Sequence, residues 1–149
     1  MFPEIRDKLV REFWDIVYDK LKEFNVEEDW IIEYDYKDVE FVISKDNNWL
    51  VYVSIGWLKE NCYYGIYFDG DSSVNRDKGL TMFNSLRSEK KLRKEKHSFG
   101  WDYFGEDFRN KNSLRKILPL NRHLLAEDYA SKIFDFIEAA KEELIKINK

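Results

Sequence analysis

The stretch at residues 47–70, "NNWLVYVSIGWLKENCYYGIYFDG", decides the fold class because its apolar residues recur with a period of two. Side chains at alternate positions of a β-strand point to the same face of a sheet. In the first run, the face predicted to lie on the core carries Trp49, Val51, Val53, Ile55 and Trp57. The run that begins at Cys62 alternates in the same way, so the sequence predicts two adjacent strands joined by "LKEN".

The alternation also assigns the two faces of the second strand. The side chains predicted to face the core are Cys62, Tyr64, Ile66 and Phe68. The outward positions are Tyr63, Gly65, Tyr67 and Asp69, together with Tyr52 from the first strand. Upstream, "VEFVIS" at 39–44 precedes the turn-rich tetrad "KDNN" and predicts a hairpin, and "WIIEYDY" at 30–36 is a candidate fourth strand. The sequence therefore predicts an antiparallel meander of three or four strands.

Two amphipathic helices flank the predicted meander. Apolar residues recur at spacings of three and four from Pro3 to about Phe24, and again from Glu127 to Ile147. Between them, residues 80–96 have the pattern of a weakly amphipathic helix, and residues 98–119 have no regular pattern. We therefore predict a single α+β domain over residues 1–149, with the first and last of these helices on the apolar face of the sheet.

Composition limits the class of protein. The chain has 149 residues, of which 36% are charged and 17% aromatic, and its net charge is −4. The charge is unevenly distributed: residues 1–71 carry a net charge of −9, residues 72–122 of +7 and residues 123–149 of −2. Such a distribution favours either internal charge pairing or two faces that meet different partners.

The remaining compositional features concern the compartment. No apolar run approaches the roughly 20 residues that span a bilayer, and the first ten residues lack the pattern of a signal peptide. The single cysteine, Cys62, forms no internal disulfide framework and suits a reducing compartment. The sequence therefore predicts a cytoplasmic protein without a membrane partner.

Catalytic and metal-binding patterns are weak. His97 and His123 have no partner at ligand spacing, and no nucleophile or phosphate-loop motif occurs. Glu33, Asp35 and Lys37 alternate within "EYDYKD" and share one face of the predicted strand, as the acids and lysine of a metal-dependent nuclease do. The alternative, which we favour, is the solvated face of an edge strand. We predict no catalytic residue, no metal and no cofactor.

Two further segments offer binding surfaces. The basic residues of "RSEKKLRKEKH" are a candidate track for a nucleic-acid backbone, or else a solvated cationic face: Arg87, Lys90, Lys91, Arg93, Lys94 and Lys96. The stretch "SFGWDYFGEDFRN" at 98–110 holds five aromatic residues among three acids. It predicts either an interface that includes Trp101 and Tyr103 or a plug in which Trp101 and two phenylalanines close the core.

Part of the chain resembles a known family. The motifs "YYGI" at 63–66 and "GWDYF" at 100–104, followed by a terminal helix, resemble the C-terminal accessory region of bacterial proteins of the PD-(D/E)XK nuclease superfamily. The resemblance covers residues 39–147, and the acidic catalytic core that would precede this region is missing. It implies an accessory fold without nuclease chemistry.

These patterns favour a non-enzymatic protein that binds a protein partner, as small inhibitors, immunity proteins and accessory proteins do. Tyrosine-rich faces with acidic neighbours are typical of such interfaces. The predicted partner-binding residues are Tyr52, Tyr63, Tyr67, Glu33, Asp35, Trp101 and Tyr103. The alternatives are a nucleic-acid-binding module that uses residues 87–96 and the aromatic residues at 99–108, and a divergent metal-dependent nuclease.

Overall fold

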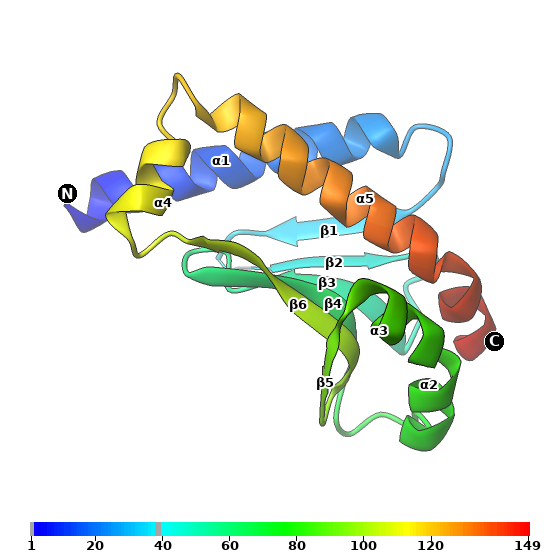
Figure 1. Ribbon diagram of the computed structural model, residues 1–149. Helices are drawn as coiled ribbons and strands as arrows, with labels where there is room; N and C mark the ends of the chain where they lie inside the picture. The colour runs from blue at the N-terminus through cyan, green and yellow to red at the C-terminus, as the bar shows by residue number, and fades with distance from the viewer. Residues whose placement is uncertain (1, 38–39) are drawn as a thin grey trace.

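The computed structural model describes residues 2–37 and 40–149, and it is an α+β protein in which two long helices cross one face of an antiparallel sheet (Figure 1). These helices are α1 (Pro3–Phe24) and α5 (Arg122–Ile147). The predicted fold class is confirmed. The sheet, however, has six strands in the described residues rather than three or four.

The strands follow the order β1-β2-β3-β4-β6-β5 across the sheet, and every neighbouring pair is antiparallel. Their bounds are β1 Ile31–Asp35, β2 Glu40–Ser44, β3 Val51–Gly56, β4 Asn61–Phe68, β5 Arg93–Glu95 and β6 Ser98–Asp107. The first four strands are the predicted meander with its fourth strand. Asp38 and Val39, which belong to two of the motifs quoted above, lie outside the described residues.

The period-two pattern assigns the core face of β3 and β4 correctly. Val53 pairs with Ile66 and Ile55 with Tyr64, and all four side chains are buried. The prediction for Trp57 is wrong: β3 ends at Gly56, and Trp57 has a φ of 52° and an exposed fraction of 55%. Because a positive φ redirects the side chain, alternation no longer holds there.

The core lies between the sheet and the two long helices. The helices fill it with large side chains, which are Phe13, Trp14, Val17 and Leu21 from α1 and Tyr129, Ile133 and Ile137 from α5. The indole Nε1 of Trp14 donates to the Leu58 carbonyl at 2.8 Å, so the ring is buried without an unpaired donor. α5 begins at Arg122, before the predicted Glu127, and the Arg122 guanidinium pairs with Glu12 of α1 at 2.5 Å.

The segment between β4 and α5 differs most from prediction. The helix predicted over residues 80–96 is instead two short helices, α2 (Arg76–Met82) and α3 (Asn84–Lys90), followed by β5. Lys91 adopts a left-handed conformation with φ 55° and ends α3. Residues 98–119, predicted to be irregular, contain β6 and α4 (Lys111–Lys116). β6 escapes a simple period-two pattern because two register shifts interrupt its pairing with β4.

β6 divides the aromatic stretch between two environments. Phe99 and Phe108 are fully buried and Phe104 is 8% exposed, so the phenylalanines close the core as predicted. Trp101 is not part of the core; it pairs with Gly65 on the opposite face of the sheet and is partly exposed. The prediction that Trp101 plugs the core is therefore wrong, because alternation along β6 sends Trp101 and Phe104 to opposite faces.

Candidate functional site

The face of the sheet that points away from α1 and α5, here called the outer face, gathers side chains from all six strands. Cross-strand partners share a face, and Tyr52 pairs with Tyr67 while Tyr63 pairs with Tyr103. Trp101 lies next to Tyr103 on this face, opposite Gly65. The structure thus brings together the five aromatic residues of the predicted partner-binding set, although their positions in the sequence span 52–103.

Five of the aromatic side chains on this side, Trp57, Tyr63, Tyr67, Trp101 and Tyr103, form a continuous cluster that we call the aromatic platform. The Tyr63 ring is its centre, with ring centroids 5.9 Å from Trp57, 5.3 Å from Tyr67 and 6.3 Å from Trp101. Trp101 in turn meets Tyr103 edge to face at 5.0 Å. Edge-to-face contacts of this kind fix the rings relative to one another.

Two glycines let the platform lie flat on the sheet. A Cβ atom at Gly56 would be 2.3 Å from the Tyr63 hydroxyl oxygen, so the tyrosine ring lies over this glycine. A Cβ atom at Gly65 would be 2.5 Å from Trp101 Cβ and 2.6 Å from the Gly100 carbonyl oxygen. The absence of side chains at both positions allows the close approach.

The tyrosines of the outer face are partly removed from water. Burial raises the pKa of Tyr52, Tyr63 and Tyr67 above the ordinary tyrosine value, and for Tyr52 the hydrogen bond to Asp69 raises it further. The Tyr52 hydroxyl donates to Asp69 Oδ1 at 3.0 Å. The rings therefore present neutral hydroxyl groups at physiological pH and stay fixed by contacts to the sheet.

Charges lie along both sides of the platform. Glu33 and Asp35 are exposed on β1, and Asp35 pairs across the sheet with Glu40 of β2, which raises the pKa of Tyr63 through its charge. We call these three residues the acidic rim. On the opposite side the Arg93 guanidinium lies over Trp101 and Tyr103, 5.3 and 5.2 Å from the ring centroids. Its Nε is 3.8 Å from Asp102.

The described helices pack on the other side of the sheet. α1 and α5 cover the core face, as Figure 1 shows. α2 contacts the same side, because its Gly79 lies against the Phe99 ring, and Phe99 stacks on Phe68 of the core at 4.7 Å. α3 and α4 contribute Leu86 and Leu114 to the core. Among the described residues, no helix therefore covers the aromatic platform.

The predicted nuclease-like triplet does not assemble a metal site. Asp35 Oδ1 accepts a hydrogen bond from the Lys37 backbone nitrogen at 2.8 Å, which is a local turn contact. Within residues 2–37 and 40–149, no group of three or more histidine, cysteine and acidic side chains is arranged to hold a metal ion. Glu33 and Asp35 therefore enter the candidate site as surface charges.

The predicted basic track is divided among different surroundings. Arg87 donates to the carbonyl oxygens of Phe99 at 2.9 Å and Leu80 at 2.6 Å, so it ties α3 to β6. Lys90 lines a shallow cavity beside α5, whereas Arg93 lies on the platform. The remaining members are exposed on the α3–β5 turn and on or just after β5, namely Lys91, Lys94 and Lys96.

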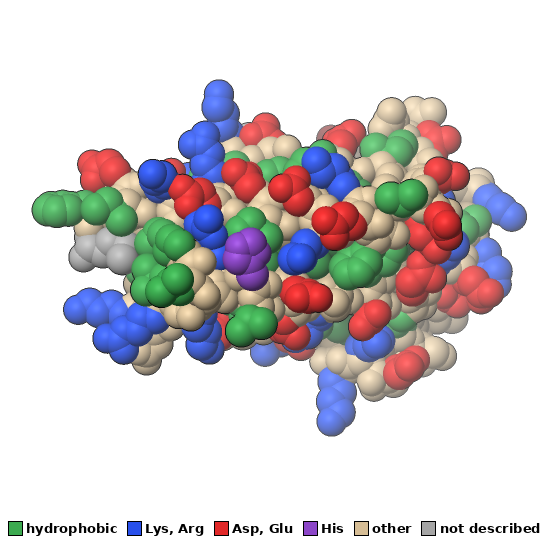
Figure 2. Space-filling model, turned by 90° about the horizontal axis from the view of Figure 1, so that it is seen from above, with side chains coloured by type: hydrophobic (Ala, Val, Ile, Leu, Met, Phe, Trp, Pro, Cys, Tyr) green, Lys and Arg blue, Asp and Glu red, His purple; other side chains and the backbone are tan. Residues whose placement is uncertain are grey.

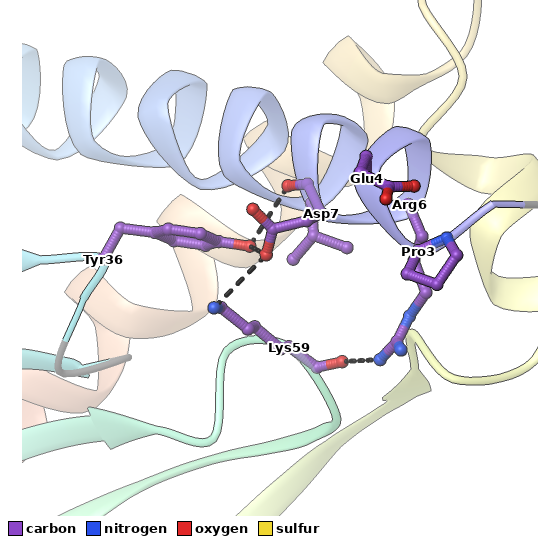
Figure 3. Close-up of a pocket in the computed structure, with 7 residues that line it drawn as sticks. Pro3, Glu4, Arg6, Asp7, Tyr36 and Lys59 are labelled. Atoms are coloured by element: carbon purple, nitrogen blue, oxygen red, sulfur yellow. Dashed lines mark hydrogen bonds and ion pairs between the residues drawn. The ribbon is translucent and has the colours of Figure 1, made fainter.

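A surface cavity of about 470 Å³ lies beside the start of α1 (Figure 3). Asp7 accepts from the Tyr36 hydroxyl at 3.2 Å and pairs with Lys59 Nζ at 3.2 Å. Arg6 donates to the Lys59 carbonyl at 2.6 Å. These polar groups already bind one another. Their contacts join α1 to the turn between β3 and β4, and we assign no ligand to the cavity.

Comparison of the chain with protein-family models, with curated proteins and with solved structures finds no match. The resemblance to the accessory region of PD-(D/E)XK proteins therefore stays a prediction. None of the helices in the described part of the chain combines the length and the apolar character needed to cross a bilayer.

Sequence reasoning missed three members of the site, which are Trp57, Glu40 and Arg93. Glu40 has no predicted role, and its pairing with Asp35 places it on the acidic rim. Trp57 was placed on the core face, and only its positive φ in the structure turns it toward Tyr63. Arg93 was assigned to the basic track, although its guanidinium lies on the platform. The sequence shows only that Arg93 belongs to a basic run. It does not show that the side chain lies over the rings of Trp101 and Tyr103.

Proposed function

We propose that the protein binds a protein partner through the outer face of its sheet and acts as an inhibitor, immunity or accessory protein. The observation that carries this proposal is the aromatic platform beside the acidic rim, which none of the described helices covers. The single cysteine, buried as Cys62, suits the reducing conditions of the cytoplasm, where we expect the protein to act.

The platform has the physical properties of an interface centre. Tyrosine and tryptophan supply large contact areas with few rotatable bonds, so a partner gains contact at a low cost in conformational entropy. The rings are held by one another and by the sheet before any partner arrives, which lowers that cost further. Trp57 is 55% exposed and would gain the most burial when a partner covers it.

The charges favour a partner that presents arginine or lysine. Arg93 shows that the rings of Trp101 and Tyr103 already accept a guanidinium group within this chain. On the other side, Glu33 and Asp35 offer exposed carboxylates to a cation. The net charge of −9 over residues 1–71 would also speed the approach of a basic partner.

Nucleic-acid binding is the second candidate, because Arg93, Trp101 and Tyr103 form a stacked cation and two rings at one end of the platform. Such groups also stack on unpaired bases. The acidic rim opposes this function, since its carboxylates would repel a phosphate backbone along β1 and β2.

The test is capture of the partner with the protein as bait in extracts of its native host, with identification by mass. The double variant Tyr52→Ala/Tyr67→Ala removes Tyr67 from the platform together with Tyr52, its cross-strand partner on the outer face. It should bind the captured protein about thirtyfold more weakly, as the loss of aromatic anchors does. The control is Phe24→Ala, since Phe24 lies on α1, on the core side of the sheet, and is 44% exposed.

Two outcomes would contradict the proposal. Unaltered affinity in the folded double variant would place the interface elsewhere. Tight binding of a single-stranded oligonucleotide at physiological salt, lost in Arg93→Glu, would make nucleic acid the ligand of the platform.

A further inference from the structure

One end of the molecule exposes leucine side chains that the proposed function does not use. Leu120 is 97% exposed, Leu124 is 79% exposed and Leu118 is 36% exposed, all in or beside the connection between α4 and α5. The same end holds the start of α1, where Phe2 is 73% and Ile5 50% exposed. Figure 2 shows hydrophobic side chains gathered at this end, with Lys and Arg side chains next to them.

The backbone holds these leucines in water. The Leu118 carbonyl accepts from the backbone nitrogens of Asn121 at 2.9 Å and of Arg122 at 3.0 Å, and the Asn121 side chain donates to the Arg115 carbonyl at 3.2 Å. The connection is therefore a tight turn with its own hydrogen bonds. Leu120 lies at the tip of this turn, and its side chain is not part of the core.

The charge of this segment is opposite to that of the whole chain. Residues 109–126 contain five arginine and lysine residues and no acidic residue, although the net charge of the protein is −4. Three of the five are neutralised by acids outside the segment: Arg109 is paired with Asp107 and Glu60, Lys116 with Glu106, and Arg122 with Glu12. Lys111 and Arg115 form no ion pair within the described residues, and both line a surface hollow of about 240 Å³ with Leu114 and Leu118.

We propose that the leucine tip, defined as Lys111, Arg115, Leu118, Leu120 and Leu124, docks on the surface of an anionic lipid bilayer. Exposed leucines insert below the headgroups, while lysine and arginine contact the phosphates, which is the chemistry of interfacial anchors. The exposed leucines match the apolar layer of such a surface, and Lys111 and Arg115, which have no ion pair among the described residues, match its anionic headgroups. Surface docking needs no membrane-spanning segment, so it is compatible with the absence of one among the described helices. It replaces the sequence-based prediction of no membrane partner, which considered only membrane-spanning segments and signal peptides.

The experiment is co-sedimentation of the full chain with vesicles of phosphatidylcholine alone and of phosphatidylcholine with about 30% phosphatidylserine. Binding should be at least about tenfold stronger to the anionic vesicles and should weaken as salt is raised. Leu120→Asp/Leu124→Asp and, separately, Lys111→Glu/Arg115→Glu should each reduce that binding at least about tenfold.

The control variant is Val26→Asp, because Val26 is 78% exposed and follows the far end of the 22-residue helix α1. It should leave vesicle binding unchanged. Thermal melting of every variant should match the wild type, since the changed side chains are exposed. Wild-type protein that stays in solution with anionic vesicles, or that binds neutral vesicles equally well, overturns the proposal, as does Leu120→Asp/Leu124→Asp that still sediments. None of these results bears on the aromatic platform, which Tyr52→Ala/Tyr67→Ala tests separately.

Discussion

Substitution of Gly65 by alanine tests whether the platform depends on the close packing of β4 and β6. The added Cβ atom would lie 2.5 Å from Trp101 Cβ and 2.6 Å from the Gly100 carbonyl oxygen. Both atoms move only if β6 moves. The matched change is Gly56→Ala, where the nearest atom is the Tyr63 hydroxyl oxygen at 2.3 Å, the end of a side chain that can rotate away.

The magnitude follows from two opposing contributions. Replacement of a strand glycine by alanine stabilises a protein by about 0.5–1 kcal/mol, because the unfolded chain loses freedom. Overpacking against atoms that cannot yield costs about 1–3 kcal/mol. We therefore expect Gly65→Ala to lower the free energy of unfolding by about 1–2 kcal/mol, which lowers Tm by roughly 3–8 °C in a domain of this size. Gly56→Ala should cost less than Gly65→Ala, because the atoms that the new Cβ meets belong to one side chain rather than to the backbone.

The assay is urea unfolding followed by far-ultraviolet circular dichroism, with thermal melting as a second measure. An unchanged slope of free energy against urea would show that only stability has changed. Gly56→Ala should also lift the Tyr63 ring from the sheet and weaken partner binding, with a smaller loss of stability than in Gly65→Ala. Wild-type stability in Gly65→Ala, or equal destabilisation in both variants, would refute this account of the packing.

Three further predictions concern buried groups. Phe108→Ala should lower the free energy of unfolding by about 3–5 kcal/mol in urea titrations, because the ring is fully buried with its centroid 5.3 Å from that of Phe13; a loss below about 1 kcal/mol would contradict its place in the core. Burial opposes ionisation of Glu106, but hydrogen bonds from Lys116 and Ser113 outweigh it and lower the pKa. The stability that Glu106 contributes is then present above the unfolded pKa of about 4.3 and is lost as pH falls through the lower folded value. The difference in stability between wild type and Glu106→Gln should therefore shrink between pH 7 and pH 3, and a difference that grows in acid would show the opposite shift. Burial raises the pKa of Cys62 to about 12, so this thiol should resist a disulfide reagent at pH 8 in the folded protein and react at once in urea; rapid reaction of the folded protein would show that the thiol is accessible.

The sequence predicted the local elements because each repeats a simple period. Alternation in residues 47–70 placed Val53 and Ile55 on the core face and Tyr52, Tyr63 and Tyr67 on the other. Spacings of three and four located α1 and most of α5. These patterns depend only on the geometry of a single helix or strand, which the chain reveals without its neighbours.

The assembly of the candidate site depended on a pairing that no local pattern specifies. β6 hydrogen-bonds to β4 across an intervening segment that contains α2, α3 and β5, and this pairing sets Tyr103 beside Tyr63. Two register shifts interrupt the period-two pattern of β6, so the pattern does not predict this strand. Trp57 has a left-handed backbone conformation and therefore does not follow the alternation of β3. The sequence therefore determined which face the residues of β3 and β4 take. Only the tertiary structure decided the faces of β6 and the order of the strands, because the pairing of strands far apart in the chain depends on hydrogen bonding and burial over the whole domain.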